Sequence, residues 1–300
     1  MKIIYLDQNV ASYLAKESPE PIWKQIKIAL VEGFQCRKLV CPLPFETIIE
    51  TAPLPLTRRQ SIQQLFWQLS EGVGFKSFVQ MSNELTLALV RPNEDVLPWI
   101  IWKPVWAEME KESSQVASDW RKGKDAMRQR MQAFVRSSNL ESMSVNQLLH
   151  AVAAQRSGWL LRDLSRLSSG IESESPLNFP FLIEHLIAQR VSPAEIEAFH
   201  RAVQHHAWAK IPIHFFDAFL GARWEHDMIR GGAAAYHPNN EIDSKRASLA
   251  LSYADLFITE GDLANRCLRS KVSDFSHTQV FSIREPDKVL KTVQAIVSSS

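Results

Sequence analysis

Cysteine is scarce in this sequence, and so are long apolar runs. The chain of 300 residues has three cysteines, without a Cys-x-x-Cys pair or a nearby histidine at metal-ligand spacing, so we expect neither a disulfide framework nor a zinc site. Buried free thiols in a reducing compartment are the expectation. No apolar run approaches the ~20 residues that span a bilayer, and the N-terminal stretch does not resemble a signal peptide. These absences predict a cytoplasmic protein without a membrane partner.

An excess of charge of one sign is also lacking. Lys and Arg number 34 and Asp and Glu number 33, which gives a formal charge of +1. A balanced charge neither favours nor excludes nucleic acid, because a local basic face can still bind phosphate. Hydrophobic residues make up 45% of the chain, enough for a sizeable core in one large domain or two ordinary ones.

The most informative stretch lies at the N-terminus, where the apolar run IIYL ends at Asp7. A continuous apolar run is typical of a strand in a parallel sheet covered on both faces. Asp7, Gln8 and Asn9 would then lie at its carboxyl end, the edge where ligands bind in open α/β sheets. The alternative for Asp7 is a helix N-cap, which Asn9 could also provide.

A second stretch repeats this logic near the C-terminus, with the sequence NNEIDSKRASLALSYADLFITEGD. A helix predicted from Ile242 to about Ser252 places Asp243 in its first turn, where it could also serve as a cap or compensate the helix dipole. The strand DLFIT follows, with Glu260 and Asp262 immediately beyond it. Asp255 begins that strand, roughly 13 Å or more from Glu260 at about 3.3 Å per residue, so we expect it at the opposite edge in a structural role.

Four short motifs in this order, YLDQN, FETIIET, EID and DLFITEGD, together resemble the PIN-like metal-dependent nucleases. The resemblance implies an α/β fold with a PIN-like parallel sheet flanked by helices. It implies a discontinuous nuclease core, 1–55 plus 236–300, which includes last elements predicted near 278–283 and 286–296. The residues between, 56–235, show helical periodicity at 57–69, 99–136, 145–167, 179–188, 193–206 and 213–230, and we expect a large all-helical insertion.

The resemblance also implies a metal site of carboxylates. An acid on the helix after the second strand completes that site in the family, and FETIIET places Glu50 there, although Glu46 lies nearer the strand end and either could reach the cleft. From the residues alone, this pair at a spacing of four could equally be an exposed acidic helix start. The family's last motif usually has Thr followed closely by Asp, so either Glu260 or Asp262 takes the fourth position. The implied ligands are Asp7, Glu50, Asp243, Glu260 and Asp262.

Converging carboxylates repel one another unless hard cations neutralise them, and Mg²⁺ or Mn²⁺ prefers such oxygen ligands. A metal held in this way can activate water for attack on phosphorus. Thr259 could hydrogen-bond a metal-bound water, while Gln8, Asn9 or Glu46 could position a ligand. We therefore expect a metal-dependent endoribonuclease, with RNA favoured over DNA on the resemblance alone.

A basic helix face within the insertion is the candidate for substrate binding, although one acid interrupts it and solvated surface is the alternative. Its members are Arg121, Lys122, Lys124, Arg128 and Arg130. Two other functions stay open: an inactive PIN-like scaffold that binds RNA or protein, and a toxin paired with an antitoxin-like protein. A homodimer is also open. The acids Asp217, Glu225 and Asp227 are expected at the surface, and the alternative for one of them is to position a metal ligand.

Overall fold

The computed structural model describes residues 1–91, 95–101, 144–169, 179–205, 210–231, 240–269, 271 and 275–299. These residues divide into two compact units. The first unit comprises described residues of 1–77, 98–130 and 249–300, and the second comprises those of 78–97 and 131–248. The chain is thus α/β, with a mostly parallel sheet flanked by helices in the first unit and helices in the second.

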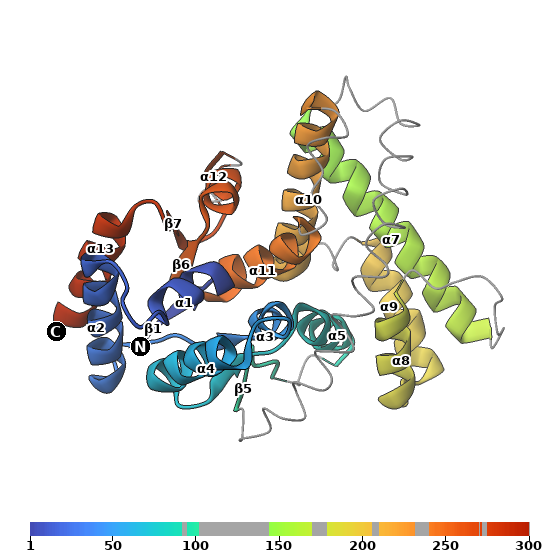
Figure 1. The fold of residues 1–300 in the computed structure, drawn as a ribbon. Coiled ribbons are helices and arrows are strands. Elements are labelled where there is room, and N and C mark those ends of the chain that lie inside the picture. The colour runs from blue at the N-terminus through green and yellow to red at the C-terminus, as the bar shows by residue number, and fades with distance from the viewer. Residues whose placement is uncertain are drawn as a thin grey trace. The chain divides into compact units, whose positions relative to one another are not determined.

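The first unit is built on a parallel four-stranded sheet of order β2-β1-β6-β7. Its strands are β1 (Lys2–Leu6), β2 (Leu39–Val40), β6 (Leu256–Thr259) and β7 (Gln279–Ser282). Two strands come from each end of the chain, as Figure 1 shows in blue and red. The prediction that both ends share one parallel sheet is confirmed.

Burial explains why the apolar runs became central strands. Ile4, Tyr5 and Leu6 of β1 are fully buried, and every residue of β6 is buried. The helices α2 (Pro21–Gln35) and α13 (Pro286–Ser298) pack along each other beside the sheet (Figure 1). Gly33 of α2 permits a close approach, because a Cβ there would lie 2.6 Å from Leu39 Cδ2 and 2.9 Å from Val297 Cγ2.

The region after residue 56 is not all-helical, so that prediction is wrong. A second sheet of order β3-β4-β5 is formed by β3 (Leu43–Pro44), β4 (Val73–Phe75) and β5 (Trp99–Ile101). Trp99 therefore lies in a strand, where we predicted a helix start. The helix α4 (Leu56–Ser70) belongs to the first unit, because Leu65, Phe66 and other apolar side chains enter the core shared with β1 and α2.

The remaining helices agree with the predicted segments in most cases. They are α1 (Gln8–Leu14), α3 (Phe45–Thr51), α7 (Val145–Ser169), α8 (Pro180–Ala188), α9 (Pro193–Gln204), α10 (Pro212–Gly231) and α11 (Asn240–Tyr253). Two helices were not predicted, α5 (Phe78–Ala88) and α12 (Gly261–Arg269). A capping box, in which Ser192 and Glu195 satisfy each other's backbone N–H groups, begins α9.

The structure bears on two features that the sequence has little of, long apolar segments and cysteines. Within the described ranges, no helix has the length and apolar character needed to cross a membrane. None of the three cysteines is in a disulfide bond. Cys41 and Cys267 are buried, but Cys36 is exposed, so the expectation of buried thiols is wrong for Cys36. Burial raises the pKa of the Cys41 thiol well above its ordinary range.

Asp255 lies at the amino end of β6, where strand direction places it. Its Oδ1 accepts a hydrogen bond from Lys2 Nζ and its Oδ2 accepts one from the backbone N–H of Ile3, both at 2.8 Å. Partial burial acts to raise the pKa of Asp255, but these two bonds outweigh it and the net pKa is lowered. Asp255 therefore anchors the start of β1.

We predict that Asp255→Ala lowers the free energy of unfolding by about 1–2 kcal/mol, since it removes a backbone hydrogen bond and an exposed ion pair. Because folding lowers this pKa, the contribution is present at neutral pH and is lost as the pH falls through the carboxyl range. Urea unfolding at pH 7 and at acidic pH measures both effects. Lys2→Met is the matched control and should cost less, because it leaves the bond to Ile3 in place.

Candidate functional site

Asp7 lies at the carboxyl end of β1 and is fully buried. Although Asp7 occupies the N-cap position of α1, its side chain makes no capping hydrogen bond. Its Oδ2 instead accepts a hydrogen bond of 2.6 Å from Thr259 Oγ1, at the end of the neighbouring strand β6. Parallel pairing of Leu6 with Ile258 brings these two side chains together. The N-cap alternative for Asp7 is therefore not the role of its carboxyl group.

Glu260 follows Thr259 at the same edge and is partly buried. Its Oε2 accepts a hydrogen bond of 3.1 Å from Asn9 Nδ2, on the first turn of α1. The residues that follow β1 and β6 thus meet across the strand ends. Gln8 was predicted to position a ligand, but its Nε2 donates to Ser12 Oγ within α1 at 3.0 Å.

A guanidinium group lies at this edge beside Gly261, the first residue of α12. A Cβ on Gly261 would lie 2.8 Å from Arg284 Nε and 2.9 Å from Arg284 Cζ, so any other residue there would make the guanidinium shift. Arg284 follows β7, the strand paired with β6. Sequence reasoning missed this cation, because the sequence contains no signal that pairs residue 284 with residue 261.

Asp262 has a different environment from Glu260. It lies on the first turn of α12 and is exposed to solvent, in a position that favours the helix dipole. Glu260 is the acid held against α1, through Asn9. Of the two alternatives left open by the sequence, Glu260 is therefore the one whose side chain is positioned by a neighbouring residue of the motif.

The two acids of α3 lie on a helix that packs against α1. Glu46 is buried, with 6% of its surface exposed, and Glu50 one turn later is partly buried. The expected exposed acidic helix start is thus excluded for Glu46. The sequence favoured Glu50 and left Glu46 as the alternative, and the deeper burial of Glu46 keeps both as candidates.

The donor chemistry of this edge fits a hard divalent cation, since it offers carboxyl oxygens. However, the described residues bring together too few donors to complete a metal site. Among the residues that the structure describes, no three His, Cys, Asp or Glu side chains lie close enough together to hold a metal ion. A complete metal site at Asp7 and Glu260 is therefore a prediction.

Asp243 lies in the first turn of α11, in the part of the helix grouped with the second unit. Its Oδ1 lies 3.6 Å from Arg246 Nη1, one turn further along the helix. Its membership of the Asp7 site stays a prediction. The basic residues Arg121, Lys122, Lys124, Arg128 and Arg130 fall outside the described residues, so their role in substrate binding also stays a prediction.

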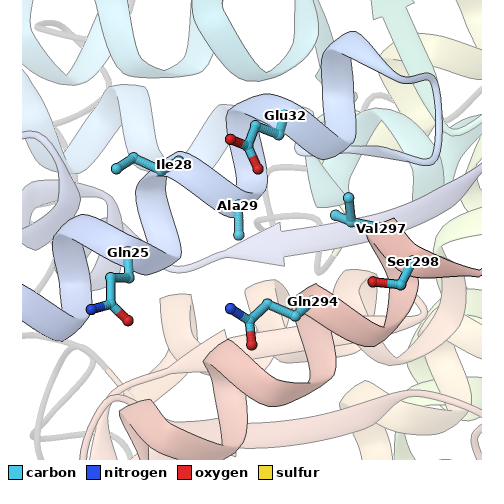
Figure 2. Close-up of a pocket in the computed structure, with 7 residues that line it drawn as sticks. All are labelled: Gln25, Ile28, Ala29, Glu32, Gln294, Val297 and Ser298. Atoms are coloured by element: carbon cyan, nitrogen blue, oxygen red, sulfur yellow. The ribbon is translucent and has the colours of Figure 1, made fainter.

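A groove of about 320 Å³ lies elsewhere in the first unit, between α2 and α13. Figure 2 shows polar groups at its rim, including Gln25, Glu32 and Gln294, around the apolar Ala29 and Val297. None of the predicted site residues lines this groove. The carboxyl edge of the sheet, and not the groove, contains the motif residues.

The second unit contains a buried charged cluster that we did not predict. Asp217 of α10 is 2% exposed, where we expected it at the surface, and that expectation is wrong. It accepts hydrogen bonds from Arg156, Ser244 and Lys245. The signal was present in the sequence, because Asp217 interrupts the otherwise apolar run FFDAFL and a buried acid at such a position needs partners.

Comparison of the chain with protein-family models, with curated proteins and with solved structures gives no match.

We predict that Thr259→Val destabilises the first unit by about 1–3 kcal/mol, because it removes the hydrogen bond to the buried carboxyl of Asp7 without changing the volume much. Thr259→Ser keeps the hydroxyl, so its free energy of unfolding should fall clearly less. Thermal and urea unfolding of the two variants measure the difference. A loss in Thr259→Ser with little or none in Thr259→Val would show that Thr259 contributes only its methyl group.

Proposed function

We propose that the chain is a metal-dependent endoribonuclease that hydrolyses phosphodiester bonds at the carboxyl edge of its parallel sheet. The observation that carries this proposal is the orientation of Asp7. Its buried carboxyl group faces the end of β6 and accepts from Thr259, and it does not cap α1. Burying a carboxyl group is costly, so a position that stability alone would leave to an apolar residue supports a chemical role.

The residues at this edge have separate tasks in the proposal. Thr259 fixes the orientation of the Asp7 carboxyl group, and Asn9 fixes that of Glu260. Asp7 and Glu260 are the proposed ligands, joined by Glu46 or Glu50 and by Asp243. When bound, Mg²⁺ or Mn²⁺ would supply an activated water and neutralise charge on the phosphate. Arg284 offers a cation to the phosphate oxygens, since its guanidinium forms no ion pair with any described residue.

The PIN-like resemblance of the motifs around Asp7, Glu50, Asp243 and Glu260 supports this reaction and the choice of RNA over DNA. An inactive PIN-like scaffold is the second candidate, favoured by the shortage of converging acids within the described residues. Glu260 in place of the family's usual Asp also favours the inactive scaffold. A toxin paired with an antitoxin-like protein would use the same chemistry as the enzyme.

The test is cleavage of a fluorescent single-stranded RNA with Mn²⁺, together with Mn²⁺ binding by calorimetry. Asp7→Asn and Glu260→Gln each remove a charge with little change of shape, so we expect cleavage to fall at least about a hundredfold while the fold survives. Metal affinity should fall with it. Asp243→Asn tests the further predicted ligand in the same assay.

Asp255→Asn is the matched control, because Asp255 lies at the opposite end of β6 and should leave cleavage per folded molecule unchanged. Asn caps a helix about as well as Asp, so a capping role predicts no effect of Asp7→Asn. Wild-type protein that binds Mn²⁺ without cleaving RNA or DNA would favour the scaffold. Loss of Mn²⁺ binding in Asp255→Asn but not in Asp7→Asn would contradict the proposed site.

A further inference from the structure

The charged cluster of the second unit contains more positive charge than its acid can balance. Asp217 Oδ2 accepts hydrogen bonds from Arg156 Nη1 at 2.5 Å and from Lys245 Nζ at 2.6 Å. Asp217 Oδ1 accepts one from Ser244 Oγ at 2.8 Å. Two cations thus share a single carboxylate oxygen, and the group of three charged residues has a net charge of +1.

The acid is buried, but the two cations reach solvent. The side chain of Asp217 is 3% exposed, while those of Arg156 and Lys245 are 23% and 27% exposed. Burial acts to raise the pKa of Asp217, but the charges of Lys245 and Arg156 outweigh it and hold the pKa well below its usual range. Asp217 therefore stays ionised, and it holds both cations in place at the boundary with solvent.

Two ionisable groups near the cluster, both among the described residues, do not cancel the surplus charge. His214 lies in the same environment, and burial lowers its pKa to about 3, so it is neutral near pH 7. Asp243, two residues before Lys245, lies near Arg246 at 3.6 Å. Lys245 Nζ also lies 4.5 Å from the centre of the Phe78 ring, a contact that further restricts its position.

Most hydrogen-bond donors of the two cations have no acceptor within the described part of the chain. A lysine has three N–H donors and an arginine has five. Among described residues, each forms one hydrogen bond, the one to Asp217. Because Nη1 and Nζ both lie within 2.6 Å of the same oxygen, they are at most about 5 Å apart and repel each other.

A small multivalent anion satisfies these conditions better than a second carboxylate would. A phosphate group presents several acceptor oxygens and at least one negative charge, and both arginine and lysine bind it. The hydrogen bond from Arg156 Nη1 to Asp217 holds the guanidinium in place beside Lys245. A purely structural ion pair would need only one of the two cations.

We propose that Arg156 and Lys245, held by Asp217, form a binding site for a phosphate group in the second unit. The ligand is the phosphate of a polynucleotide backbone, an assignment that rests on the proposed nuclease function. The site itself rests only on the cluster. It would give the chain an affinity for nucleic acid that the acids of the sheet edge cannot supply.

The first experiment measures binding of inorganic phosphate to the full chain by calorimetry, without metal. We expect Lys245→Met and Arg156→Met to weaken it about five- to tenfold, since each removes charge-assisted hydrogen bonds. Lys245→Arg should retain most of the affinity. The control is Arg201→Met, which removes a cation from the exposed pair with Glu197 in the same unit. Equal binding by all variants, or none by the wild type, would overturn the site.

A stability measurement covers the case in which a variant folds poorly. Lys245→Met leaves Asp217 paired with Arg156 and Ser244, so it should remain folded. Asp217→Asn leaves two cations without a counter-charge, and we expect its melting temperature to fall and to recover as phosphate is added. Recovery no larger than that of Arg201→Met under the same conditions would contradict the site.

The second experiment measures anisotropy of a fluorescent single-stranded RNA with EDTA present, so that no cleavage occurs. Lys245→Met should weaken binding and reduce the slope of log affinity against log salt by about 1. Loss of phosphate binding with unchanged RNA binding would overturn the polynucleotide assignment. Failure of the proposed function is distinct, because wild-type protein would then show no Mn²⁺-dependent cleavage while the phosphate results stand.

Discussion

The parallel pairing of β1 with β6 is the constraint on which the rest of the first unit depends. It joins residues that are more than 250 positions apart, with Tyr5 opposite Phe257 and Leu6 opposite Ile258. A shift by one residue would turn every side chain to the other face of the sheet. At one end the pairing brings Thr259 to Asp7, and at the other it brings Asp255 to Lys2 and Ile3.

The same pairing explains why Asp7 and Asp255, at opposite ends of adjacent strands, have different environments. Asp255 is satisfied by a backbone N–H and an ammonium group, which makes it a structural anchor. Asp7 is fully buried and faces a threonine hydroxyl at the edge where α/β sheets bind ligands. Strand direction thus places the two carboxyl groups at opposite edges of the sheet. The one at the carboxyl edge has a proposed chemical role, and the one at the amino edge contributes to stability.

The sequence predicted the parts of the fold in which local pattern and tertiary structure agree. The runs IIYL and LFIT became central strands because uniformly apolar segments fit a sheet covered on both faces. The predictions failed where elements were short. β4 and β5 have three residues each, and the tryptophan spacing that begins at Trp99 is also that of a helix. Asp217 was misplaced because its three partners come from other parts of the chain.

The sequence predicted which positions belong to the candidate site, but not how their side chains contact one another. The motifs identified Asp7, Thr259 and Glu260, whose positions follow from strand order. The choice between Glu46 and Glu50 depends on how α3 packs, which no local pattern determines. The pairing of Arg284 with Gly261 depends on register between β6 and β7, which is a property of the folded sheet.

The most direct measurement is a crystal structure of the protein soaked in Mn²⁺, with anomalous scattering used to locate the metal. We predict a peak about 2 Å from a carboxyl oxygen of Asp7, with Glu260 also in reach, at the carboxyl edge of the sheet. It would also identify which acid of α3 is a ligand. An ordered metal at Asp255, or a fully soaked crystal without metal at Asp7, would contradict the account.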